Sequence, residues 1–118
     1  MGLKVKETTF SARDTLRITS ATDAVPMKDV PDGTELHYIG YVKTEITNES
    51  SGEIFDSIVI KTEDGSLYAT RSASFMRALE EILETISEFG EDDLEPIILT
   101  VKKLKSKNGN TFVTCQLA

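Results

Sequence analysis

The sequence has one cysteine, one histidine and no tryptophan among its 118 residues. A single thiol cannot form an internal disulfide, which favours a reducing, cytoplasmic setting, and we interpret Cys115 as a small core residue. His37 alone cannot build a multi-histidine metal site, and we interpret it as a strand-surface or half-buried side chain. No cysteine pair for zinc and no glycine-rich phosphate-binding motif occurs. These absences favour a protein without cofactor or catalytic centre.

Long hydrophobic runs are also lacking. No stretch approaches the eighteen or so consecutive apolar residues of a membrane span, and the first residues lack the apolar core of a secretory signal. The length suits one domain, and the 39% hydrophobic residues suffice for a core. We expect a single domain over residues 1–118 that does not bind membranes, with residues 1–12 as either an extra strand or a flexible lead-in.

The acidic excess is confined to one part of the chain. The net charge is −7, and the segment from Ser72 to Glu95 accounts for all of it, with eight acidic residues and Arg77 as its only cation. The last stretch, Ile97–Ala118, has four lysines and no acid. Such a separation of acidic and basic segments is typical of a protein that binds a charged ligand through one surface, whatever its total charge. The net acidity therefore does not exclude nucleic-acid binding.

Acidic residues do not form a recognisable cation site. The run Glu91–Glu95 lacks the spacing and the internal glycine of a calcium loop, so we interpret it as a solvated acidic loop. None of the twenty Asp and Glu residues stands out as half of an acid–base pair. We therefore predict no metal site and no enzyme activity.

Three turn signals divide the chain. Asp64-Gly65 and Asn108-Gly109 lie between apolar runs, and each predicts a hairpin with a two-residue loop and positive φ at both positions. Asp32-Gly33, after Pro31, predicts a turn that leads into a long strand.

Between these turns the hydrophobic period changes from that of a strand to that of a helix. Apolar residues recur at intervals of three and four while glutamates occupy the other side; they are Phe75, Leu79, Ile82, Leu83, Ile86 and Phe89. Ser72 or Ser74 can cap the start, and Gly90 is placed to end the helix in a left-handed conformation. Pro96 prevents continuation. We predict one amphipathic helix of roughly four turns.

The other segments are interpreted as strands. Leu16–Ile18 is expected to be a short strand and Leu36–Thr47 a long one, followed by Ile54–Lys61 with a short return at Leu67–Thr70, and after the helix by Ile97–Lys103 and Phe112–Leu117. Five strands with a helix between the third and fourth is the order of an oligonucleotide/oligosaccharide-binding (OB) Greek-key barrel. We therefore predict a mainly β OB-like fold; another small α+β roll with similar elements stays open.

Rings and cations on these strands favour a binding surface. Proteins that bind single strands pair aromatic faces, on which bases stack, with cations along the phosphates. In an OB barrel the ligand crosses strands two and three, beside the loop between strands four and five. That loop is here Lys103–Asn110, the most basic part of the chain. We predict stacking on Tyr41, Phe55 and Phe112, with phosphate contacts from Lys43, Lys61, Arg71, Lys102, Lys103, Lys105 and Lys107.

The second half of the sequence resembles a known family. The runs Asp64–Thr70, Ser72–Phe75 and Ser106–Leu117 contain a D-G-x-x-Y-x-T turn, an S-x-S-F helix start and a K-N-G-N-x-F-x-T-C-x-L terminus. They are similar to small single-stranded-DNA-binding proteins of tailed phages that infect Gram-positive bacteria. The resemblance implies that the chain coats single strands during phage DNA replication in the bacterial cytoplasm, with single-stranded DNA as its partner.

Other functions remain open at this point. Aromatic residues on strands are often core, and lysines at a hairpin tip can serve only to protect a sheet edge. The acidic helix could instead bind a host or phage replication protein, as an inhibitor or adaptor that mimics nucleic acid. A third hypothesis is an assembly subunit whose long strand pairs edge to edge between copies. The oligomeric state is not set by the sequence.

Overall fold

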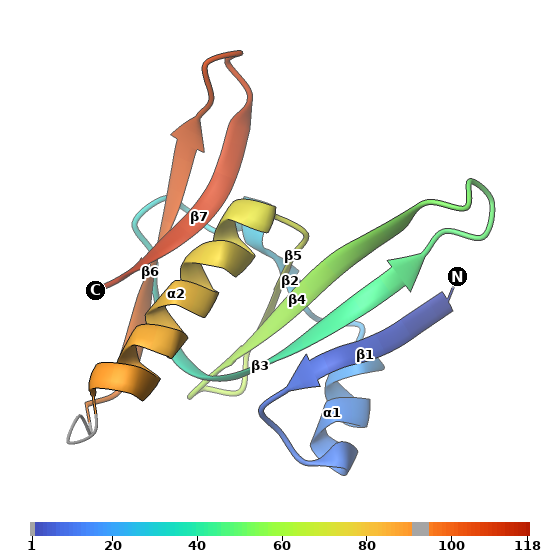
Figure 1. Ribbon diagram of the computed structural model, residues 1–118, viewed down its shortest axis with the longest axis horizontal. Helices are drawn as coiled ribbons and strands as arrows, with labels where there is room; N and C mark the ends of the chain where they lie inside the picture. The colour runs from blue at the N-terminus through green and yellow to red at the C-terminus, as the bar shows by residue number, and fades with distance from the viewer. Residues whose placement is uncertain (1, 91–94) are drawn as a thin grey trace. The chain divides into compact units, whose positions relative to one another are not determined.

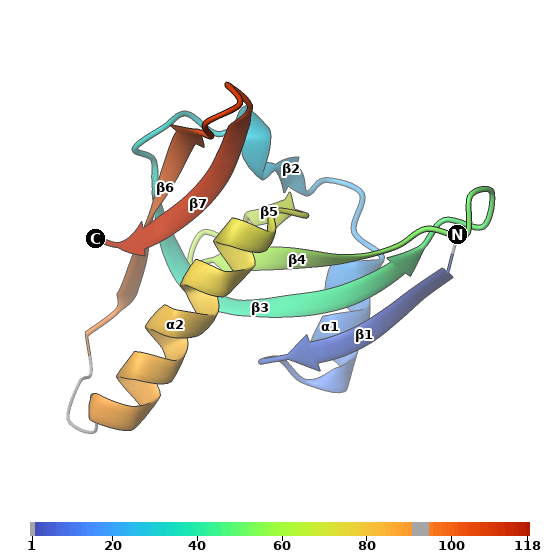
Figure 2. The same cartoon turned by 45° about the horizontal axis from the view of Figure 1, so that its top comes forward.

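The computed structural model describes residues 2–90 and 95–118 and is mainly β, with two α-helices (Figures 1 and 2). Two short elements, strand β2 (Val25–Pro26) and a 3₁₀ turn (Met27–Asp29), accompany the longer ones. The longer elements are β1 (Gly2–Thr8), α1 (Ala12–Thr19), β3 (Glu35–Thr47), β4 (Ile54–Thr62), β5 (Leu67–Thr70), α2 (Ala73–Phe89), β6 (Ile97–Lys105) and β7 (Thr111–Leu117). The predicted acidic loop Glu91–Glu95 lies, except for its last residue, outside the described residues.

The chain forms two compact units, and β3 runs from one into the other. The first unit comprises Met1–Met27 and Ile39–Arg71; the second comprises Lys28–Tyr38 and Ser72–Ala118. In the first, the strand order is β2-β5-β4-β3, and β1 pairs with β3. The β2–β5 pair is parallel, whereas β1–β3 and β4–β5 are antiparallel. In the second, β3 and β7 both pair antiparallel with β6.

The prediction of a strand at Leu16–Ile18 is wrong, because these residues belong to helix α1. Ser11 caps the helix, and its hydroxyl accepts a hydrogen bond from the backbone N–H of Asp14 at 3.2 Å. Thr15 and Ile18, one turn apart, are its buried residues. Ile18 is β-branched, a type common in strands, but the spacing of the buried residues Thr15 and Ile18 is that of a helix face.

Both predicted hairpins form, but their loops have three residues instead of two. The N–H of Gly65 donates to the carbonyl of Thr62 at 2.9 Å, and the N–H of Thr62 donates to the carbonyl of Ser66 at 3.0 Å. Only the glycine has positive φ, +86°. This pattern is a type I turn followed by a bulge, which needs one left-handed residue. The β6–β7 loop has the same two bonds. The N–H of Gly109 donates to the carbonyl of Ser106, and the N–H of Ser106 donates to the carbonyl of Asn110.

Hydrogen bonds within the β4–β5 loop stabilise the charged carboxylate of Asp64. The Thr62 hydroxyl donates to the Asp64 carboxylate at 2.5 Å, and the N–H of Ser66 donates to it at 2.9 Å. Both bonds favour the charged carboxylate and so lower the pKa of Asp64. The aspartate therefore orders the loop.

Helix α2 has the predicted boundaries. Ser72 caps its start: the hydroxyl accepts from the N–H of Phe75 at 3.2 Å and donates to the carbonyl of Val113 on β7 at 2.5 Å. Gly90 ends the helix with φ of −103°, so the predicted left-handed conformation at this glycine is wrong. Phe75 and Leu79 are buried, whereas the four glutamates of the helix are exposed. The first turns of α2 thus lie against β7.

Strand β3 is not an available edge. Its residues 35–38 pair with β6, its residues 42–47 pair with β1, and β4 is its other neighbour in the sheet. The hypothesis that this long strand pairs edge to edge between copies is therefore wrong, because its backbone hydrogen bonds are already used within the chain. No helix among residues 2–90 and 95–118 has the length and hydrophobicity of a membrane span.

Cys115 is a core residue, as predicted, and only 5% of it is exposed. Burial raises the pKa of its thiol to about 11. Because the thiolate is the reactive species, a pKa of about 11 in place of the ordinary 9.0 should reduce labelling near neutral pH roughly 100-fold relative to an ordinary thiol. We expect a thiol reagent to label the native chain slowly and the urea-unfolded chain rapidly; equal rates would contradict a buried thiol.

The same pKa predicts how stability depends on alkaline pH. Between pH 9 and 11 the unfolded thiol ionises while the folded thiol keeps its proton, so the free energy of unfolding should fall as pH rises through this window. A Cys115→Ala variant should lack this component in urea titrations.

Candidate functional site

The predicted binding residues are divided equally between the two units. The five in the first unit are Tyr41, Lys43, Phe55, Lys61 and Arg71, and the five in the second are Lys102, Lys103, Lys105, Lys107 and Phe112. The three predicted stacking rings are half-buried, so none of them is sealed in the core. We describe the surroundings of each group within its own unit.

Gly40 marks one face of the sheet in the first unit. A Cβ at this position would meet the ring of Phe10, whose Cε1 lies 2.9 Å from the Cβ position, and the hydroxyl of Thr9 at 2.5 Å. Phe10 therefore covers the backbone at Gly40. The ammonium of Lys61 lies 6.0 Å from the centre of the Phe10 ring, so Lys61 is on this same face. We call it the Gly40 face.

Phe55 and Arg71 extend the Gly40 face along β4 and β5. Phe55 precedes Lys61 by six residues in one strand, so the two side chains share a face. The β4–β5 register pairs Ile58 with Thr70, which places Arg71 diagonally beside Phe55. The guanidinium of Arg71 lies 4.3 Å from the centre of the Phe55 ring. An exposed arginine and a half-exposed ring thus form one stacked pair.

Tyr41 and Lys43 lie on the opposite face, because side chains alternate along a strand. There they adjoin β1: Lys43 pairs in register with Glu7, and the Tyr41 hydroxyl donates to the Glu7 carboxylate at 3.4 Å. A carboxylate beside both residues repels phosphate. The structure therefore brings Phe55, Lys61 and Arg71 to one face and separates Tyr41 and Lys43 from them.

The β6–β7 hairpin of the second unit also distributes its predicted residues over two faces. Phe112 pairs with Leu104, and Lys102, two residues before Leu104, lies on the same side. Lys103 and Lys105 lie on the other side, which Lys103 shares with its buried partner Val113. Lys107 is an exposed residue of the loop.

Lys103 has a structural role. Its ammonium donates to the carbonyl of Lys28 at 2.6 Å, and its backbone N–H donates to the Asp32 carboxylate at 2.8 Å. These bonds attach the hairpin to the turn that precedes β3 within the second unit. Lys105 and Lys107, both exposed, are better placed than Lys103 to meet a ligand.

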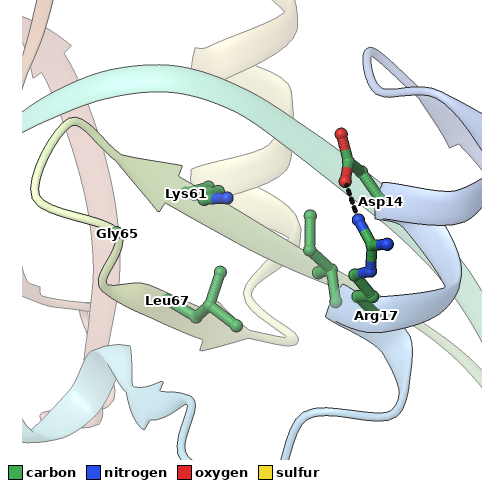
Figure 3. Close-up of a pocket in the computed structure, with 6 residues that line it drawn as sticks. Asp14, Arg17, Lys61, Gly65 and Leu67 are labelled. Carbon is green, nitrogen blue, oxygen red and sulfur yellow. Dashed lines mark hydrogen bonds and ion pairs between the residues drawn. The ribbon is translucent and has the colours of Figure 1, made fainter.

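Helix α1 adds a cation that the sequence interpretation missed. A pocket of about 140 Å³ in the first unit is lined by residues of α1 and of the β4–β5 hairpin: Asp14, Arg17, Ile18, Lys61, Gly65 and Leu67 (Figure 3). The signal for α1 was the capping pattern Ser11-x-x-Asp14, which places Arg17 and Ile18 on successive positions of a helix. Within residues 2–90 and 95–118 no cluster of His, Cys, Asp and Glu has the arrangement of a metal site.

Comparison with known families identifies the chain along nearly its whole length. The model of the family described as Phage Single-stranded DNA-binding protein matches residues 4–118. No curated protein and no solved structure matches the chain. The match extends the resemblance seen from Asp64 onward to the first half of the sequence.

Proposed function

Because this chain belongs to the phage single-stranded DNA-binding protein family, we propose that it coats single-stranded DNA during phage DNA replication, with little dependence on base sequence. The family consists of DNA-binding proteins, which agrees with the expectation of a chain without catalytic activity. The stacked pair of Phe55 and Arg71 is the observation that supports the Gly40 face as the binding surface.

Stacking on Phe55 explains why binding would tolerate any sequence. Every base has a π face, so a ring contributes without reading hydrogen-bond edges. The Arg71 guanidinium lies over the Phe55 ring and has five N–H donors with which it can contact a phosphate. Lys61 lies on the same face, so a strand that follows β4 would meet a ring and two cations.

The β6–β7 hairpin is proposed as a separate contact with DNA. Phe112 and Lys102 share one side, and Lys105 and Lys107 are exposed near the tip. Strands β3–β7 with α2 between β5 and β6 have the element order of an OB barrel, in which such a hairpin flanks the ligand. We propose that the chain is an OB-type domain with β1, α1 and β2 as additions.

A salt titration tests single-strand binding. Each neutralised phosphate of a single strand contributes about −0.7 to the slope of log K against log salt. Four contacts would give a slope of about −3, which is roughly a 50-fold loss of affinity between 50 and 200 mM salt. We expect this behaviour in fluorescence anisotropy with labelled poly-dT, and weaker binding of duplex DNA. Tight binding that salt does not change would contradict the proposal.

The acidic side of α2 supports a second candidate, binding to a basic surface of a replication protein. Phe89, at the end of the helix, is 81% exposed, and four exposed glutamates precede it: Glu80, Glu81, Glu84 and Glu88. An exposed aromatic ring surrounded by acidic side chains is typical of a surface that binds another protein. A pull-down in which Phe89→Ser abolishes recovery of a replication protein, while poly-dT binding persists, would favour this additional role.

A further inference from the structure

The pocket between α1 and the β4–β5 hairpin has the composition of an anion site. Two of its six lining residues are cations from different elements: Arg17 from α1 and Lys61 from β4. Ile18 and Leu67 supply its apolar walls, and Gly65 contributes only backbone. Figure 3 shows Lys61 and Leu67 on the hairpin facing Asp14 and Arg17 on the helix. Positive groups thus converge on one hollow from two directions.

The single carboxylate of the pocket positions its arginine. Asp14 lies one turn before Arg17 on α1, and its carboxylate accepts a hydrogen bond from Nη1 of Arg17 at 2.9 Å. A guanidinium has five N–H donors in a fixed plane, so this bond orients the group and leaves donors for a second anion. The Asp14 charge is largely compensated by Arg17, and Lys61 supplies the additional positive charge that an anion requires.

The size of the pocket limits what it can hold. A volume of about 140 Å³ exceeds what one water molecule needs but is well below the roughly 300–1,000 Å³ of pockets that enclose a drug-sized ligand. A phosphate group fits this range, whereas a whole nucleotide does not. None of the six described residues that line the pocket is aromatic, so the pocket itself offers no ring for a base.

We propose that Arg17 and Lys61 form a subsite for one backbone phosphate of single-stranded DNA, positioned by Asp14. This inference rests on the proposed function and assigns α1 to the binding surface. The strand would place a base on Phe55 near one end of β4 and a phosphate near Lys61 at its other end. Binding energy at the subsite would come from phosphate alone, so it would add affinity without sequence preference.

Substitution on α1 tests the subsite with a matched control. Arg17→Gln removes the pocket guanidinium, and Arg13→Gln removes an exposed arginine of the same helix that does not line the pocket. Both variants change the net charge equally. We expect Arg17→Gln to reduce the magnitude of the salt slope for poly-dT by about 0.7, the contribution of one phosphate, and Arg13→Gln to leave it unchanged. Equal slopes for Arg17→Gln, Arg13→Gln and the unsubstituted chain would overturn the subsite while leaving single-strand binding intact.

A second measurement separates the subsite from the proposed function. NMR titration of the unsubstituted chain with dTMP and with inorganic phosphate should shift the backbone amides of Ile18 and Gly65, at the pocket wall, and the Arg17→Gln variant should abolish the shifts. If the chain fails to bind poly-dT but these shifts occur, the proposed function is wrong, and the pocket binds a phosphate group without serving single-stranded DNA. Absence of the shifts, with poly-dT binding intact, would overturn the subsite.

Discussion

Replacing Phe55 by alanine should weaken binding to poly-dT by about 1–3 kcal/mol, or roughly 5- to 150-fold, because a stacked base is lost. The half-buried ring is stacked on Arg71, at 4.3 Å from the guanidinium. Its removal also leaves the guanidinium without the surface that orients it. Fluorescence anisotropy at fixed salt measures the loss, and the slope against salt should change little, since no phosphate contact is removed.

Two variants distinguish stacking from a general loss of apolar surface. Phe55→Tyr keeps a ring and should retain affinity. Ile54→Ala removes an exposed apolar side chain from the adjacent position of β4, which points to the other face, and should bind as the unsubstituted chain does. Full affinity in Phe55→Ala, with a preserved melting temperature, would exclude this ring as a stacking platform.

Gly40→Ala should destabilise the chain by about 1–3 kcal/mol, the usual cost of overpacking. The added methyl would overlap the ring of Phe10 and lie 2.5 Å from the Thr9 hydroxyl. Thr9 cannot move freely, because its hydroxyl accepts from the N–H of Tyr41 at 3.0 Å and its own N–H donates to the Tyr41 carbonyl at 3.1 Å. Thermal unfolding should show a decrease of roughly 4 °C for each kcal/mol.

The matched control is Gly2→Ala, in the adjoining strand β1. A Cβ there lies 3.7 Å from Thr47, an ordinary contact, so stability should be nearly unchanged. In a chain that already carries Phe10→Ala, adding Gly40→Ala should cost less stability than it does in the unsubstituted chain, since the ring clash disappears while the Thr9 contact remains. If the two glycine variants melt at the same temperature, Phe10 does not pack on Gly40.

Part of the proposed binding surface could be predicted from the sequence, because residue type and position in the chain were enough to select its residues. Phe55, Lys61 and Arg71 were identified as a ring and cations on consecutive strands, and the structure places them on one face. Tyr41 and Lys43 satisfied the same criteria, but they point to the opposite face, beside Glu7. Arg17 was missed because its segment was interpreted as a strand instead of a helix.

The sequence by itself determined helix α2, the glycine turns and the long strands, because these depend on local period and on residues that permit a turn. The alternation of apolar and polar residues around Cys115 also indicated that this side chain is buried. Only the tertiary structure decided which face each strand presents. Alternation along a strand shows only that neighbouring side chains point to opposite faces. Which face each residue takes depends on the pairing with β1 and on the packing of Phe10 over Gly40, and these partners lie roughly 30 to 45 residues away in the chain.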